Sequence, residues 1–190
     1  MRLSSKVIAF TLIMAALGNT LSALSIGLTK VGQIGLDLSH IATFIASVYG
    51  GPVMGFLIGL VGGIVPGVYF GPMGGLSWLG LIGLPVGKAL TGVTTGALCK
   101  LFNVNQRAHP SILTVPIVLI GYIPECLFTI FFFLVLVPYF FGWASVSLLI
   151  SILVKAWIEI GVMSVLMGAL TGNGGFNTFM TKILTLHKVK

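Results

Sequence analysis

Residues 45–59 read Ile-Ala-Ser-Val-Tyr-Gly-Gly-Pro-Val-Met-Gly-Phe-Leu-Ile-Gly, an apolar run interrupted at its middle by two glycines and a proline. Glycine adopts turn conformations at little cost and proline suits the first position of a helix, so one helix can end here and the next begin at once. We therefore predict a tight hairpin of two helices, over residues 38–49 and 52–65. Neither reaches the roughly 20 residues that cross a bilayer, so both are expected to be short, tilted or extended into their loops.

The chain on either side of this hairpin is equally apolar. Of its 190 residues, 57% are hydrophobic and 7% are charged, whereas about 25% are charged in an ordinary soluble protein. The mean hydropathy is +1.14, which indicates an integral membrane protein. Further spans are expected over residues 6–28, 78–102, 111–137 and 144–171. The predicted fold is a single all-α domain, residues 1–190, built as a compact bundle of six transmembrane helices.

The cationic residues predict how this bundle is oriented. Six spans place both termini on one side, and that side holds seven of the ten Lys and Arg residues: Arg2, Lys6, Lys100, Arg107, Lys182, Lys188 and Lys190. The opposite side holds only Lys30. The positive-inside rule then predicts cytoplasmic termini in a multi-pass protein of the cell membrane. The net charge of +7 is explained by this topology and does not argue for nucleic acid as a partner.

Four ionisable side chains lie inside the predicted spans: Lys88, Glu125, Lys155 and Glu159. A charge near the bilayer centre costs roughly 2.5–3.5 kcal/mol, so such residues face the bundle interior and usually mark a ligand, ion or proton site. At a rise of about 1.5 Å per residue, all four reach mid-membrane on the last three spans. They are expected to surround one cavity. Alternatively, Lys155 pairs with Glu159 and Lys88 with Glu125, and the pairs only hold the bundle together.

Other side chains share the faces or the depth of these charges. Ser151 lies on one helical stripe with Lys155 and Glu159, although small hydroxyl residues also support helix packing. Tyr122 shares a face with Glu125. The candidate substrate-binding residues are Lys88, Glu125, Lys155, Glu159, Asn19, Tyr122, Ser151 and Trp78. Trp78, like Tyr69, Phe70, Tyr139 and Trp143, stacks on a flat ligand or belongs to an interfacial aromatic belt.

The segment Asp37-Leu38-Ser39-His40 opens the second helix on the outer side. Asp37 or Ser39 is interpreted as the cap of that helix. A metal ion needs more ligands than Asp37 and His40 supply, so no metal site is expected. No cofactor is expected in this chain either.

Small residues recur at four-residue spacing in several spans. Gly55, Gly59 and Gly63 do so on the third helix, and Gly92 with Gly96 on the fourth. Such spacing lets helix backbones approach closely, within the chain or against another membrane protein. On the first helix the small or polar residues Ala15, Ala16, Asn19, Thr20 and Ala23 form a face that either packs internally or docks a partner.

Six spans, cytoplasmic ends, the Gly-Pro-x-x-Gly-x-x-x-Gly hairpin at residues 51–59 and the Gly/Pro-rich outer loop at residues 66–77 resemble the S component of an energy-coupling factor transporter. The resemblance covers nearly the whole chain. It implies that a vitamin or related micronutrient is captured from outside. It also implies delivery through a separate transmembrane T component and two cytoplasmic ATPases that use the ATP. Docking is implied for an Ala-x-x-x-Ala-type face, which here reads Ala15-x-x-x-Asn19 and Ala16-x-x-x-Thr20.

Two buried cations and two buried anions suit a small substrate with a carboxylate or a zwitterionic character. The alternative is a stand-alone proton-coupled secondary carrier, which would also use buried Glu and Lys, although the sequence has no evident internal repeat. An enzyme is not expected, because Ser77 has no convincing base and the sequence contains neither a His-Glu-x-x-His motif nor a nucleotide-binding loop.

Overall fold

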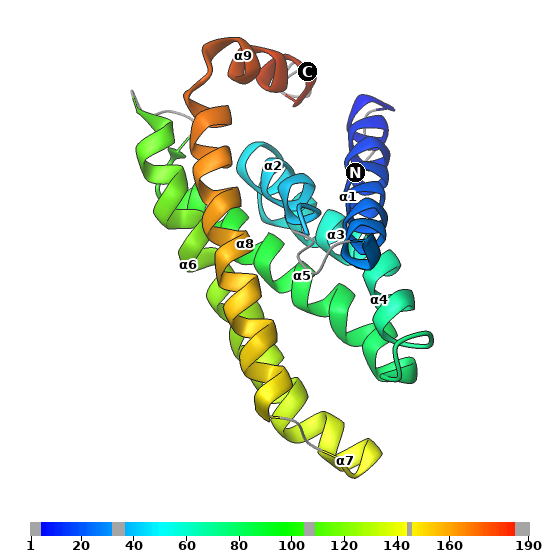
Figure 1. The fold of residues 1–190 in the computed structure, drawn as a ribbon. Coiled ribbons are helices and arrows are strands. Elements are labelled where there is room, and N and C mark those ends of the chain that lie inside the picture. Colours follow the sequence, from blue (N-terminus) through cyan, green and yellow to red (C-terminus); the bar gives the residue numbers. More distant parts are fainter. Residues whose placement is uncertain (1–4, 32–36, 105–108, 144–145, 185–190) are drawn as a thin grey trace.

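The protein is described by a computed structural model over residues 5–31, 37–104, 109–143 and 146–184. The regular elements of these residues are helices (Figure 1): α1 (Ser5–Val31), α2 (His40–Gly50), α3 (Pro52–Gly62), α4 (Ile64–Phe70), α5 (Ser77–Leu101), α6 (Pro110–Phe131), the π-helical turn η2 (Phe132–Leu136), α7 (Val137–Phe141), α8 (Val146–Gly172) and α9 (Gly174–Leu184). The predicted all-α class is confirmed for this part of the chain.

Five helical stretches among the described residues are long and apolar enough to cross a membrane: Val7–Leu28, Pro52–Phe70, Ser77–Leu101, Pro110–Phe141 and Val146–Gly172. They indicate a multi-pass membrane protein. The remaining predicted span corresponds to α2, which has 11 residues. The count of six spans and the cytoplasmic termini therefore stay predictions. Arg2, Arg107, Lys188 and Lys190, on which the orientation partly rests, lie outside the described residues.

The predicted hairpin joins α2 to α3 through a single glycine. Gly51 has φ of 82°, a value that favours glycine, and Pro52 then occupies the first turn of α3. Residues 42–48 of α2 are all buried, so this short helix is surrounded by the longer ones (Figure 1). Its length is consistent with this central position, because it faces protein on every side.

Glycines bring α3 and α5 into direct backbone contact. A Cβ atom on Gly55 or Gly92 would overlap the main-chain carbonyl of the other, and one on Gly59 would overlap the carbonyl of Lys88. The two helices run antiparallel, since residues that are later in α3 meet residues that are earlier in α5. Close packing within the chain, expected for these glycines, therefore fixes the depth of Lys88 on α5.

The third predicted helix ends later than expected. The segment beginning at Pro66 was expected to be a loop, but α4 continues in the direction of α3 to Phe70 after a break at Gly63. Asn19 of α1 bridges this break, because its Nδ2 donates to Val61 O at 2.9 Å and its Oδ1 accepts from Val65 N at 3.0 Å. Pro66 lies in the first turn of α4, where its missing N–H costs little.

The fifth predicted helix is also longer than expected. Residues 138–143 were expected to form a connection, yet the helix runs from α6 through η2 into α7 and ends at Phe141, before the left-handed Gly142. Pro138 stands in the first turn of α7, so it does not break the helix. In Figure 1 this long helix runs beside α8, and the two diverge from α4 and α5 toward one end of the molecule.

The chain beyond the last predicted span, residues 144–171, contains a further helix, α9. Met180 of α9 is buried in the main apolar core. The hydroxyl of Tyr49 in α2 donates to Asn177 Oδ1, and Asn177 Nδ2 donates to Thr171 O at 2.6 Å. These contacts attach α9 across the ends of α2 and α8.

Candidate binding site

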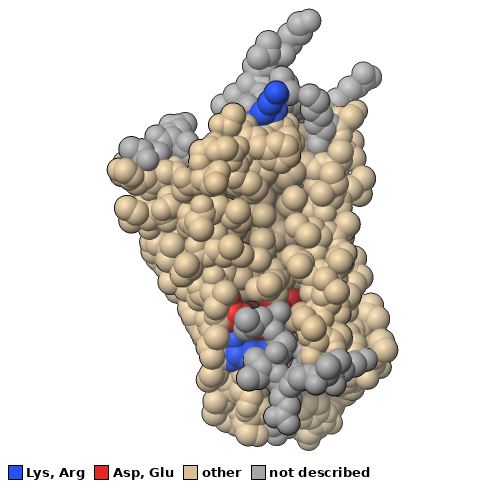
Figure 2. Space-filling view, turned by 45° about the horizontal axis from the view of Figure 1, so that its top comes forward, with Lys and Arg blue, Asp and Glu red and all other residues tan. Residues whose placement is uncertain are grey.

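A cavity of about 650 Å³ lies between α4, α5, α6 and α8 and the turn that precedes α2. Six side chains that can carry charge near neutral pH line it: Asp37, His40, Lys88, Glu125, Lys155 and Glu159. The sequence contains three Asp and Glu residues in total, and all of them line this cavity. Figure 2 shows acidic and basic atoms recessed at one place in a face that is mostly uncharged.

Lys88 projects from α5 into the turn before α2 and is only 4% exposed. Its Nζ lies 3.4 Å from Asp37 Oδ2 and donates a hydrogen bond to Ser39 Oγ. The Ser39 main-chain N–H donates to Asp37 Oδ1 at 3.0 Å. The turn thus surrounds the ammonium group with oxygen atoms, which offsets the cost of burying it.

Asp37 and Ser39 therefore do not act as predicted. Neither side chain caps α2 in the structure, and both hold Lys88. Burial alone would raise the pKa of the Asp37 carboxyl, but the charge of Lys88 and the hydrogen bonds with Ser39 outweigh burial and hold this pKa well below its ordinary value. Asp37 is thus a carboxylate at neutral pH.

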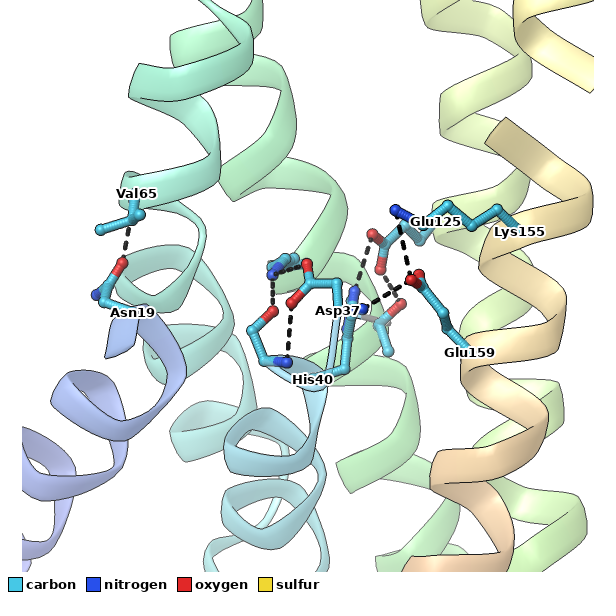
Figure 3. A network of polar contacts seen from close by, with 10 residues as sticks. Asn19, Asp37, His40, Val65, Glu125, Lys155 and Glu159 are labelled. Atoms are coloured by element: carbon cyan, nitrogen blue, oxygen red, sulfur yellow. Dashed lines mark hydrogen bonds and ion pairs between the residues drawn. The ribbon is translucent and has the colours of Figure 1, made fainter. Parts of the chain in front are cut away.

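Glu125 lies on α6 and pairs with residues other than Lys88. Its Oε1 is 3.5 Å from His40 Nε2, and its Oε2 accepts a hydrogen bond from the Thr91 hydroxyl (Figure 3). The His40 ring stacks on Phe44, with ring centroids 5.9 Å apart, and meets the edge of Tyr122. The alternative in which Lys88 pairs with Glu125 is wrong, because the turn before α2 supplies Asp37 to the lysine instead.

Glu159 and Lys155 form the ion pair that their spacing predicts, with Lys155 Nζ 3.6 Å from Glu159 Oε1. The same carboxylate oxygen accepts the Asp37 main-chain N–H at 2.7 Å. Asp37 therefore contacts α8 through its backbone and α5 through its side chain. Figure 3 shows Asp37 beside Glu159, with Lys155 and Glu125 close to them.

The rest of the cavity wall is largely aromatic and aliphatic. Phe128, Phe132 and Phe133 contribute from α6 and η2, Tyr69 contributes from α4, and Trp143 contributes from the segment after α7. Tyr122 packs edge-on against Trp157 with ring centroids 5.2 Å apart. A cavity with apolar walls and a few convergent polar groups is typical of sites for small organic molecules.

The structure brings five of the eight candidate residues to the cavity: Lys88, Tyr122, Glu125, Lys155 and Glu159. It does not bring Asn19, Ser151 or Trp78 there. Asn19 is engaged at the break between α3 and α4. Ser151 is exposed and donates to Ser147 O at 2.9 Å. Trp78 is 48% exposed and contacts the edge of Phe140.

The sequence interpretation missed Asp37 and His40 as cavity residues. Their position at the start of a helix favoured a capping role, which is the common one for Asp and Ser there. A stronger signal was their rarity, since Asp37 is the only Asp in a chain with three acidic residues. Within the described residues, no three His, Cys, Asp or Glu side chains are grouped so as to hold a metal ion.

Comparison with models of protein families, with curated proteins and with solved structures gives no match to this chain. The functional argument therefore rests on the cavity and on the sequence pattern.

Proposed function

We propose that this chain is the S component of an energy-coupling factor importer in the cell membrane. It captures a small organic micronutrient, of the vitamin class, from the outer side. The observation that carries the proposal is the cavity of about 650 Å³, which gathers every acidic residue of a membrane-embedded bundle beside two lysines and aromatic walls. Buried charges are costly in a membrane, and apolar replacements are often as stable as a buried ion pair, so a ligand explains their presence.

Transport in this proposal depends on other subunits. A transmembrane T component and two cytoplasmic ATPases would move the substrate inward and use the ATP, while this chain holds no cofactor, binds no nucleic acid and catalyses no reaction. The proposed topology has six spans, with α2 as the short one, and both termini in the cytoplasm. The predominance of Lys and Arg on that side supports it.

The proposed docking face lies on α1 and is narrower than the face predicted from sequence. Ala16, Thr20 and Ala23 are exposed on one side of α1, and small residues there would let a partner helix approach closely. Ala15 is buried, and Asn19 is engaged with α3 and α4. These two residues are therefore left out of the docking face that we propose.

Co-expression tests the proposal. The chain is produced with a T component and two ATPases encoded by the same genome, and the purified complex is analysed by size-exclusion chromatography and mass spectrometry. A stable complex that takes up substrate only with ATP is the expected result. A chain that never associates with these subunits, and that acidifies vesicles on its own during uptake, would show the proton-coupled carrier instead.

A further inference from the structure

The charges of the cavity are unequal in number. Its lining holds three carboxylates, Asp37, Glu125 and Glu159, but only two lysines, Lys88 and Lys155. The lining also holds His40, which is 8% exposed. The lining thus has one more carboxyl group than lysines, and ionisation of all three carboxyl groups leaves one negative charge for a bound cation to neutralise.

The ion pairs show where that charge lies. Lys88 pairs with Asp37 and Lys155 pairs with Glu159. Among the described residues, no lysine nitrogen lies within 4.0 Å of Glu125, whose contacts are the Thr91 hydroxyl and His40 Nε2. Glu125 is therefore the carboxylate of this cavity that has no cation of its own.

A second group beside Glu125 also lacks a partner. The buried Nδ1 atom of His40 has no hydrogen-bond partner. With His40 Nε2–H directed at the Glu125 carboxylate 3.5 Å away, Nδ1 is an acceptor on the side of the ring that faces away from Glu125. It is buried, so it does not contribute to ligand binding in this arrangement. Glu125, whose oxygens can accept further hydrogen bonds, is therefore the acceptor available to a group that donates N–H bonds.

We infer that the ligand of this cavity is an organic cation with a flat aromatic body, whose positively charged nitrogen group lies against Glu125. This inference rests on the proposed function and replaces the carboxylate or zwitterionic substrate expected from sequence. Both lysines are already neutralised by carboxylates of the chain, so a ligand carboxylate would have to displace one of them. The aromatic rings of Tyr122 and Phe128 lie on the same helix as Glu125 and suit the flat body and the cation.

Three indole compounds of matched shape test the inference: tryptamine is a cation, tryptophol is neutral and indole-3-acetate is an anion. Their affinities for the full chain in lipid nanodiscs are measured by isothermal titration or by competition in ligand-detected NMR. We expect tryptamine to bind at least about tenfold more tightly than tryptophol, since a hydrogen bond between charged groups is stronger than one between a hydroxyl and a carboxylate. Indole-3-acetate should bind more weakly than both.

The variant Glu125→Gln keeps the shape of the side chain and should remove the preference for tryptamine over tryptophol. Thr129→Val, which changes an uncharged lining residue one turn further along α6, should keep that preference. An anion that binds as tightly as the cation, or a Glu125→Gln protein that still prefers the cation, would overturn the inference. The same holds if tryptamine does not bind at all.

The wild-type series decides the question even if Glu125→Gln fails to fold. Its outcome is also separate from that of the co-expression experiment. A protein that assembles with the T component and the ATPases but prefers the anion would retain the proposed function and lose this inference. A protein that prefers the cation but never assembles would support the cationic ligand and contradict the proposed function.

Discussion

At the scale of single residues, Asp37 is the side chain on which most of the polar network depends. It meets Lys88 through its carboxylate and Glu159 through its main-chain N–H. It lies in the turn before α2, where a polar residue usually serves the helix that follows. Here the side chain serves a lysine 51 positions later in the sequence. No pattern of local spacing in the sequence predicts a contact between residues so far apart in the chain.

The Asp37 pair predicts how stability depends on pH. The folded-state pKa of Asp37 lies below its ordinary value of 3.8, so the folded protein binds this proton less readily than the unfolded one. The contribution of Asp37 is therefore fully present above pH 3.8 and is lost as the pH falls through the folded-state pKa. We expect Asp37→Asn to be less stable than the wild type at neutral pH and this difference to shrink below that value. Thermal unfolding of both proteins in detergent between pH 3 and 7 measures this difference in stability. A difference that stays constant over this range would contradict the ion pair of Asp37 with Lys88.

Lys88 gives a second prediction at this scale. Lys88→Met removes the charge and keeps most of the side-chain volume, which leaves Asp37 and Ser39 without their shared partner. Since Asp37 is partly exposed, water can replace part of this contact, so the bundle should fold. The freed Asp37 carboxylate adds a negative charge to the cavity, so the affinity for the cation tryptamine should not fall. Lys100→Met, which changes an exposed lysine at the end of α5, is the matched control. A loss of tryptamine affinity of about tenfold or more in Lys88→Met, with Lys100→Met unchanged, would contradict a ligand that is held by Glu125 and not by Lys88.

At the scale of elements, the α3–α5 pair depends on glycines whose backbones touch. We expect Gly59→Ala to destabilise the protein by about 1–3 kcal/mol, because the added methyl overlaps the main chain of α5 and no flexible side chain can yield. Gly161→Ala in α8 is the control, since its Cβ would meet nothing within 4 Å. That change should be neutral or stabilising by up to about 1 kcal/mol. Equal effects of the two substitutions on thermal unfolding would show that α3 and α5 do not pack in this way.

The junction between α3 and α4 depends on Asn19. Asn19→Leu should cost about 1–3 kcal/mol, since Val61 O and Val65 N lose the partner that bridges the helix break. Thr20→Leu, at an exposed neighbouring position, should have little effect on stability. Ligand affinity should change little in both, because neither residue lines the cavity. A large loss of affinity in Asn19→Leu alone would return Asn19 to the binding site.

The elements show how far sequence reasoning reached. Apolar length and the glycine and proline signals predicted the hairpin and the core of every long helix, because these depend on local composition. The helix ends near Pro66 and Pro138 were wrong, since both prolines stand in first turns of helices that continue a preceding one. The helix α9 was missed because its stability depends on tertiary contacts of Met180 and Asn177. The four charges were placed correctly around one cavity by depth, but their partners depend on how the turn before α2 folds back.

At the scale of the whole molecule, the proposed assembly makes a prediction about α1. Ala16→Phe adds a bulky ring to the exposed small-residue face and should reduce co-purification with the T component, because close helix approach is blocked. Ligand binding should be unaffected, since Ala16 lies away from the cavity lining. Ala169→Phe introduces the same ring at an exposed position of α8 and should assemble normally. Normal assembly of Ala16→Phe, or equal loss in both variants, would contradict docking through this face.

The π-helical turn η2 makes the shape of the cavity depend on the number of residues in a helix as well as on their identity. Deleting one residue within Phe132–Leu136 would convert the turn to an ordinary helical one, because a π-helical turn holds one residue more than an α-helical turn. The helix on either side would keep its orientation and Val137 would stay buried, but Phe132 and Phe133 would no longer both face the cavity. Homologous chains that differ by a single-residue gap here would then have differently shaped sites around the same charged groups. The number of residues in this helix can therefore change the size of the substrate that fits while Glu125 and Lys88 are kept.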